Sequence, residues 1–280
     1  MALTTLEEHA CFGGVQGFYE HASDAIGLPM RFGVYRPPQA AQGPVPVLYY
    51  LAGLTCNEQT FAIKAGAQRY AAQHGLMLVT PDTSPRNTGI PDAEKDWDFG
   101  VGAGFYLDAT AQPYARHWRM ESYLTDELPL VVGRNFAARP GAQGIFGHSM
   151  GGHGALTLAL RHPGLYRSVS ALAPICAPGE VPWGQKAFTG YLGADRARWA
   201  QHDAVRLIAG GARVPPLLVD QGLADQFLAQ QLQPELLEAA CAAAGQPLEL
   251  RRHAGYDHGY FFVASFMADH LAHHARGLAG

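Results

Sequence analysis

Short, uninterrupted apolar runs recur along the chain, and longer segments with helical spacing lie between them. Runs of this length without polar alternation are typical of strands buried on both faces, as in a parallel sheet. Because strand, helix and strand follow one another, the pattern predicts crossover units and a sheet covered by helices on both faces. The strand candidates are residues 46–51, 76–81, 143–147, 168–173 and 216–221, with a weaker one at 248–252.

Helix ends are recognisable between these strands. Asn57 is a suitable cap for a helix ending at Gly75, and Gly245 follows a helical segment, as helix-terminating glycines do. The helical segments are residues 57–75, 149–161, 226–244 and 258–275.

Two regions depart from this alternation. Residues 17–21 and 30–35 predict a pair of short antiparallel strands, with Gly27 and Pro29 between them. Residues 84–112 lack periodicity, and a loop that long usually has a function. No repeat or linker divides the chain. We therefore predict an α/β fold with a mostly parallel central sheet, formed as a single domain over residues 1–280.

Composition excludes several classes of protein. A hydrophobic fraction of 48% excludes disorder, and a net charge of −4 leaves no basic excess for a nucleic-acid partner. The longest nearly apolar run, residues 45–54, is far shorter than the ~20 residues that a membrane span needs. Glu7 and Glu8 do not fit a secretory signal, so we expect no membrane partner and a cytoplasmic location.

The four cysteines are far apart and form no C-x-x-C motif. We expect free thiols, with a disulfide framework as the alternative, because four is an even number. The cysteines are Cys11, Cys56, Cys176 and Cys241.

The strongest local signal is Gly147-His148-Ser149-Met150-Gly151, which fits G-x-S-x-G. The motif follows a strand candidate and precedes a helix candidate, which is the context of a nucleophile elbow. Glycines allow strand and helix to pass closely while the serine is presented at the turn. The alternative is a glycine-rich turn with an incidental serine, but this context favours Ser149 as a nucleophile.

A serine hydroxyl needs a base, and in this kind of fold the acid and then the base follow the serine along the chain. Asp225 lies on the loop after the strand candidate at residues 216–221, whereas Asp220 lies inside that strand and is the second choice. His258 lies in a glycine-flanked loop before the last helix, and His253 is the second choice. Asp195 and Asp203 rank lower, because they lie in an irregular region.

An oxyanion hole needs two preorganised N–H groups. We expect one from Met150, which follows the nucleophile, and one from Leu54, in the loop after the first buried strand. Cys56 has no partner motif that would make it a nucleophile, so we interpret it as a bystander thiol near the site. No metal motif is present.

His270, His273 and His274 lack the H-E-x-x-H pattern of a zinc site. We therefore interpret them as the solvated face of a helix rather than as metal ligands.

Motifs along nearly the whole chain resemble the S-formylglutathione hydrolase family, also called esterase D. The matching motifs include Gly53-Leu54-Thr55-Cys56, Pro81-Asp82-Thr83-Ser84-Pro85-Arg86, Trp97-Asp98-Phe99-Gly100, Pro182-Trp183-Gly184, Asp225-Gln226-Phe227 and Gly255-Tyr256-Asp257-His258. The resemblance implies an α/β-hydrolase fold and a cytosolic, often dimeric enzyme without a cofactor. It also implies hydrolysis of S-formylglutathione to formate and glutathione, with side activity on short esters.

The resemblance places the family's catalytic triad on Ser149, Asp225 and His258 and its oxyanion donors on Leu54 and Met150. It also implies sensitivity to thiol reagents through Cys56.

A formyl group is small, so we expect a tight acyl pocket walled by Trp97, Trp183 and Met150, with Cys56 nearby. The alternatives are a general short-chain carboxylesterase, an acyltransferase, or a non-catalytic binding protein on the same scaffold.

Overall fold

The computed structural model describes residues 2–279, and within them nine strands form one sheet in the order β1-β2-β3-β5-β4-β6-β7-β8-β9. The sheet is antiparallel from β1 to the β3–β5 pair and parallel from β5 to β9. The strands are β1 Leu3–Cys11, β2 Gly14–Ala22, β3 Pro29–Arg36, β4 Val45–Leu51, β5 Met77–Pro81, β6 Ala138–His148, β7 Ser168–Leu172, β8 Leu217–Gly222 and β9 Leu248–His253.

The predicted strands and their arrangement are confirmed, since each candidate run overlaps one observed strand. The prediction missed β1, which pairs with β2 at the edge of the sheet. Most β1 side chains are exposed, so the strand carries no alternation of apolar and polar residues that would reveal it.

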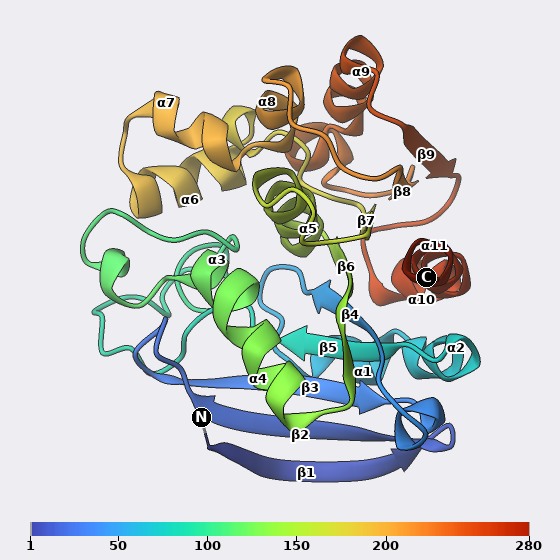
Figure 1. The fold of residues 1–280 in the computed structure, drawn as a ribbon. Helices are drawn as coiled ribbons and strands as arrows, with labels where there is room; N and C mark the ends of the chain where they lie inside the picture. Colours follow the sequence, from blue (N-terminus) through green and yellow to red (C-terminus); the bar gives the residue numbers. More distant parts are fainter. Residues whose placement is uncertain (1, 280) are drawn as a thin grey trace.

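Helices cover both faces of the sheet. Figure 1 shows α2 and α11 on one side and α4 and α5 on the other, and each of these helices contacts strands of the sheet. The helices are α1 Thr60–Lys64, α2 Ala67–His74, α3 Met120–Ser122, α4 Leu128–Asn135, α5 Met150–Arg161, α6 Pro182–Leu192, α7 Arg196–Trp199, α8 Ala204–Ala209, α9 Pro234–Ala244, α10 Tyr260–Ser265 and α11 Met267–Leu278. Among the described residues, no helix combines the length and apolar character that a bilayer crossing requires.

Three predicted helices are shorter or interrupted. The segment capped by Asn57 is divided by Gly66, which has a left-handed backbone (φ 64°), and ends at Gly75 as predicted. The helix predicted from residue 226 is divided at Gln233, whose φ is 46°, and Pro234 follows it. Proline has no N–H to continue the helical hydrogen bonds, so α9 starts afresh there. The last segment is divided at Phe266.

The strand order places a natural cleft beside β4. From β4 the chain moves to β5 on one side and then returns to β6 on the other. Loops that leave β4 and β6 therefore diverge at the carboxyl ends of these strands, which is where open α/β sheets hold their ligands. Ser149 follows β6 directly, and Leu54 lies in the loop after β4.

A buried polar network joins α11 to β7 and β8. His270 donates or accepts a hydrogen bond with Ser170 Oγ (2.7 Å) and contacts Asp220 Oδ2 (3.1 Å). Arg251 binds both oxygens of Asp220, each at 2.6 Å. Burial alone would raise the pKa of Asp220, but hydrogen bonds from His270, Arg251 and His253 outweigh it and hold that pKa well below its usual range.

The interpretation of His270 and His274 as a solvated face is wrong, because both side chains are fully buried. His274 lies between Ser168 Oγ (2.7 Å) and Ser170 Oγ (2.8 Å). Their spacing of four residues places both on one face of a helix, but the sequence does not show that this face packs against serines of β7. The two imidazoles can be buried because the serine hydroxyls form hydrogen bonds with their ring nitrogens.

Folding stability should fall as the pH drops from 7.5 to 5.5. Burial lowers the pKa of His148, His153 and His274, to about 4 for His153, whereas unfolded histidine titrates near 6.5. Over this range each of these histidines binds a proton in the unfolded chain but stays neutral in the folded chain. Each one therefore lowers the free energy of unfolding by about 1.4 kcal/mol at pH 5.5. Urea unfolding at several pH values measures this loss. His153→Phe should reduce the loss at pH 5.5 by about 1.4 kcal/mol, and a profile that is level in the unmodified chain would contradict the expectation.

Candidate active site

Ser149 occupies a sharp turn between β6 and α5. Its backbone has φ 59° and ψ −120°, a combination that a residue with a side chain rarely adopts. Hydrogen bonds hold the turn, since the Ser149 amide donates to the Leu172 carbonyl (2.9 Å) and the Ser149 carbonyl accepts from His153 (3.0 Å). The hydroxyl forms no hydrogen bond with a described residue, so it is free to turn toward a ligand. The elbow predicted from sequence is therefore present.

The glycines around the serine allow the close approach of three backbones. A Cβ added at Gly151 would overlap the Leu51 carbonyl oxygen at the end of β4. A Cβ at Gly147 would overlap the Gly151 carbonyl, and one at Gly53 would lie 3.2 Å from the Ser149 Cβ. Any larger residue would push the β4 loop away from the serine.

Asp225 and His258 form a hydrogen-bonded pair across two loops. His258 Nδ1 lies 2.5 Å from Asp225 Oδ2, while Asp225 Oδ1 accepts from the Phe227 amide at 2.8 Å. The Asp225 carboxylate is fully buried, and the His258 side chain is 15% exposed. This arrangement fixes the ring so that Nε2 is left for another partner.

The backbones of these two loops are joined directly. The amide of Ala224 donates to the Tyr256 carbonyl and that of Leu223 to the His253 carbonyl, both at 2.9 Å. Gly222 makes this approach possible, because a Cβ there would overlap the Tyr256 oxygen and lie 2.8 Å from the Asp257 oxygen. The loop contacts therefore bring His258 to the buried carboxylate.

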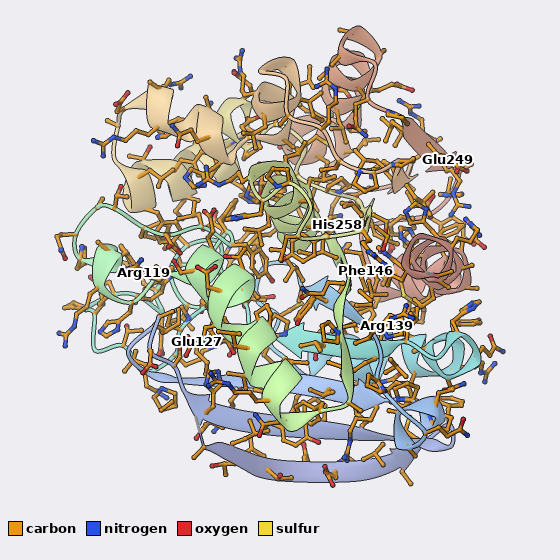
Figure 2. All side chains as sticks on the ribbon, in the orientation of Figure 1. Arg119, Glu127, Arg139, Phe146, Glu249 and His258 are labelled. Carbon is orange, nitrogen blue, oxygen red and sulfur yellow. The ribbon has the colours of Figure 1, made fainter. Side chains whose placement is uncertain are left out.

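Aromatic rings enclose the imidazole of His258. The ring of His148 lies 4.5 Å from it, centroid to centroid, and Phe227 presents an edge at 5.1 Å. Burial, and next the proximity of His258, lowers the pKa of His148 far enough to keep that ring neutral. Figure 2 shows His258 toward the middle of the molecule, well inside the rim of exposed side chains.

The two amides predicted as oxyanion donors are those of Met150 and Leu54. Met150 is the first residue of α5, so its N–H precedes the helical hydrogen-bond ladder. The Leu54 amide has no acceptor in the part of the chain that the structure describes, and Leu54 lines the same cavity as Ser149. The positive end of α5 adds to the field at this point.

One cavity of about 250 Å³ collects most of the residues singled out from the sequence. Trp97 and Trp183 stand edge to face on one wall, with ring centroids 5.6 Å apart. The lining residues are Gly53, Leu54, Cys56, Thr60, Lys64, Trp97, His148, Ser149, Trp183, Phe227, His258 and Tyr260. We refer to this cavity as the serine pocket.

Comparison with known proteins identifies the family. A family model described as "Putative esterase" matches residues 23–273. The S-formylglutathione hydrolases of Mus musculus and Paracoccus denitrificans are 50% and 52% identical to this chain, and each comparison covers 99% of both chains. A solved S-formylglutathione hydrolase from Agrobacterium tumefaciens is 48% identical, covers 98% of this chain and 99% of its own, and superposes with a TM-score of 0.96. The chain is a member of the S-formylglutathione hydrolase family.

More distant structures share the α/β-hydrolase fold with this family member. A ferulic acid esterase superposes with a TM-score of 0.75 at 19% identity, over 96% of this chain. At that identity the likeness concerns the fold alone.

Cys56 lies in the serine pocket as a partly buried thiol. Burial raises its pKa, although neighbouring groups such as Tyr260 and Thr60 oppose the shift. All four cysteines are free. A thiol with a raised pKa is a weak nucleophile at neutral pH, which agrees with its interpretation as a bystander.

The second choices for acid and base lie elsewhere. Asp220 and His253 contact each other at 3.0 Å within the network under α11, and neither lines the serine pocket. Among the described residues, no group of three or more acidic, histidine or cysteine side chains is arranged to hold a metal ion.

Sequence reasoning missed several residues of the serine pocket. His148, Phe227, Tyr260 and Thr60 also line this pocket. His148 stands inside the G-x-S-x-G motif, and Phe227 and Tyr260 each stand two residues from a predicted site residue, so proximity in sequence was the available signal.

Gly222→Ala should lower kcat about 100-fold with a smaller effect on KM. The added methyl group displaces the loop that carries His258, and a 1 Å misplacement of a reacting group costs about that much. Gly133→Ala is the matched control, because a Cβ at Gly133 meets nothing within 4 Å. Steady-state kinetics on a short aryl ester checks both variants. Equal activity in the two would show that the loop contact does not position the imidazole.

Proposed function

We propose that this chain hydrolyses S-formylglutathione to formate and glutathione, with Ser149 as nucleophile, His258 as general base and Asp225 as the group that orients the imidazole. The observation that carries the proposal is that a strained serine and a histidine paired with a buried carboxylate line one pocket. The choice of substrate rests on relatives at 48–52% identity that are named S-formylglutathione hydrolase.

In the first half-reaction the Ser149 oxygen attacks the formyl carbon while His258 Nε2 takes the hydroxyl proton. The Asp225 carboxylate accepts a hydrogen bond from Nδ1 and stabilises the imidazolium, and it remains unprotonated. The tetrahedral intermediate then collapses, the carbon–sulfur bond breaks, and the imidazolium returns its proton to the departing sulfur. The products are a formyl ester of Ser149 and free glutathione.

In the second half-reaction His258 takes a proton from water, and the resulting hydroxide attacks the formyl ester. Collapse breaks the bond to Ser149, and the proton on His258 returns to the serine oxygen. Formic acid leaves and loses its proton to the solvent, which gives formate, and the enzyme is restored.

The amides of Leu54 and Met150 are the proposed donors to the oxyanion in both steps. A preorganised donor of this kind contributes about 10²–10³ in rate in measured hydrolases. Both amides belong to backbone fixed by the glycine contacts at the elbow, so they need no rearrangement as charge develops.

The size of the serine pocket supports a small acyl group. Its volume of about 250 Å³ is below the range of about 300–1,000 Å³ that is usual for ligand sites. Trp183 is nearly buried (6% exposed) and Trp97 is 55% exposed, so we propose that Trp183 limits the acyl end and Trp97 borders the entrance.

We also propose that the enzyme acts in the cytoplasm as a homodimer. Four free thiols fit a reducing compartment. Large exposed side chains such as Ile63 (71%) and Phe261 (89%) are available for a contact between subunits.

Ser149→Ala should lower kcat by at least about 10⁴-fold, because it removes the hydroxyl on which the proposed acyl-enzyme forms. The same variant should lose labelling by a fluorophosphonate probe. Ser265→Ala, an exposed position on α10, is the control and should retain both properties. Turnover of S-formylglutathione near the unmodified rate in Ser149→Ala would refute the assignment.

The rate on acyl esters should fall as the acyl chain lengthens from formyl through acetyl and butyryl to hexanoyl. The reason is the limited depth of the pocket beside Trp183. Trp183→Leu should shift the preference toward longer chains by enlarging this wall. Values of kcat/KM along the series measure the effect, and a rise with chain length in the unmodified enzyme would contradict the assigned role of the wall.

A further inference from the structure

A second, larger cavity lies next to the serine pocket. Its volume is about 730 Å³, and Trp97 borders both cavities. The loop after β4 also contributes to both, since Leu54 and Cys56 line the serine pocket while Thr55 and Asn57 line the second one. We refer to it as the adjacent cavity. Its charged and aromatic lining includes Arg31, Glu58, Asp82, Arg86, Glu94 and Trp97.

Most charges in the adjacent cavity are already paired. Asp82 is held by Arg86, with contacts of 2.7 Å and 2.9 Å to its two oxygens. Arg31 pairs with Glu20 at 2.8 Å. Because these charges are already compensated, they need no ligand to balance them.

Among the buried charged residues of the cavity, Glu58 is the exception. Its side chain is only 4% exposed and borders the cavity, yet within residues 2–279 its carboxylate has no ion pair and accepts no hydrogen bond from another residue. Burial, and next the negative charge of Asp82, raises the pKa of Glu58, and the nearby charges of Arg31 and Arg86 oppose this shift without cancelling it. Leaving a buried carboxylate without a partner destabilises a fold, so such a group marks a place where a ligand completes the pairing.

We infer that the adjacent cavity binds the thiol portion of the substrate and that Glu58 receives the α-ammonium group at its γ-glutamyl end. The inference rests on the proposed function. Glutathione carries a single ammonium group, and it belongs to a free amino-acid end that also carries a carboxylate. The cavity offers an unpaired carboxylate for the ammonium group. Arg31 and Arg86, whose positive charges act on Glu58, line the same cavity.

This placement also explains why the cavity borders the acyl site. The sulfur must lie at the serine pocket, where its bond to the formyl carbon breaks. The γ-glutamyl arm then extends past Trp97 into the adjacent cavity. Contacts made there hold the leaving group and touch no reacting atom, so Glu58 contributes to substrate binding rather than to the chemical step.

The test compares Glu58→Gln with the unmodified enzyme on two substrates. One is S-formylglutathione, and the other is its deaminated analogue, in which hydrogen replaces the α-ammonium group. Glu58→Gln should raise KM for S-formylglutathione about tenfold or more, the usual value of a charge-assisted hydrogen bond, with kcat little changed. The unmodified enzyme should show a similarly raised KM for the analogue, which Glu58→Gln should not raise further.

Glu249→Gln is the matched control. Glu249 is exposed on β9 and lies at the edge of the molecule in Figure 2. Its replacement by glutamine should leave the KM values for both substrates unchanged. The melting temperature of Glu58→Gln should equal or exceed that of the unmodified enzyme, because an unpaired buried carboxylate has been removed.

The outcomes separate the two claims. If the unmodified enzyme fails to cleave S-formylglutathione, the proposed function is wrong. If it cleaves S-formylglutathione but Glu58→Gln behaves like Glu249→Gln, the inference about Glu58 is wrong. A lower melting temperature together with an equal rise of KM on both substrates would assign Glu58 a structural role and would also overturn the inference.

Discussion

The close packing of backbone at the end of β6 is the constraint on which the site depends. Gly147 and Gly151 lie so near the carboxyl end of β4 that neither position has room for a side chain. This packing holds Ser149 in its strained conformation, with φ 59°. Strain of this kind persists only where the surrounding structure over-determines it, and here three neighbouring strands supply that support.

Buried polar groups occur in two arrangements, one with side-chain partners and one without. Under α11, Asp220 and His270 are satisfied by side-chain partners, and the network joins the last helix to the sheet. In the two cavities, by contrast, two buried groups have no hydrogen-bond partner on another described residue: the Ser149 hydroxyl in the serine pocket and the Glu58 carboxylate in the adjacent cavity. The first arrangement stabilises the fold, whereas the second lowers stability and leaves groups available to a ligand.

The sequence was informative where a local pattern had a local cause. Continuous apolar runs gave the strands, and the glycine-flanked serine gave the elbow, because both features depend on residues adjacent in the chain. The same reasoning missed β1, whose exposed side chains carry no pattern, and it placed His270 and His274 in solvent. In the latter case the decisive partners are serines on β7, about a hundred residues away.

By itself, then, the sequence determined the α/β fold and the resemblance to a family of thioester hydrolases, and it predicted serine, acid and base in that order along the chain. Tertiary structure decided which of the candidate acids and histidines meet. Asp225 reaches His258, while Asp220 reaches Arg251 and His270, although both aspartates lie near the end of β8. The tertiary structure also leaves the carboxylate of Glu58 without an ion pair in the adjacent cavity, which Trp97 also lines. The reason is that pairing of charges depends on distances between segments remote in the chain, and spacing along a sequence does not encode these distances.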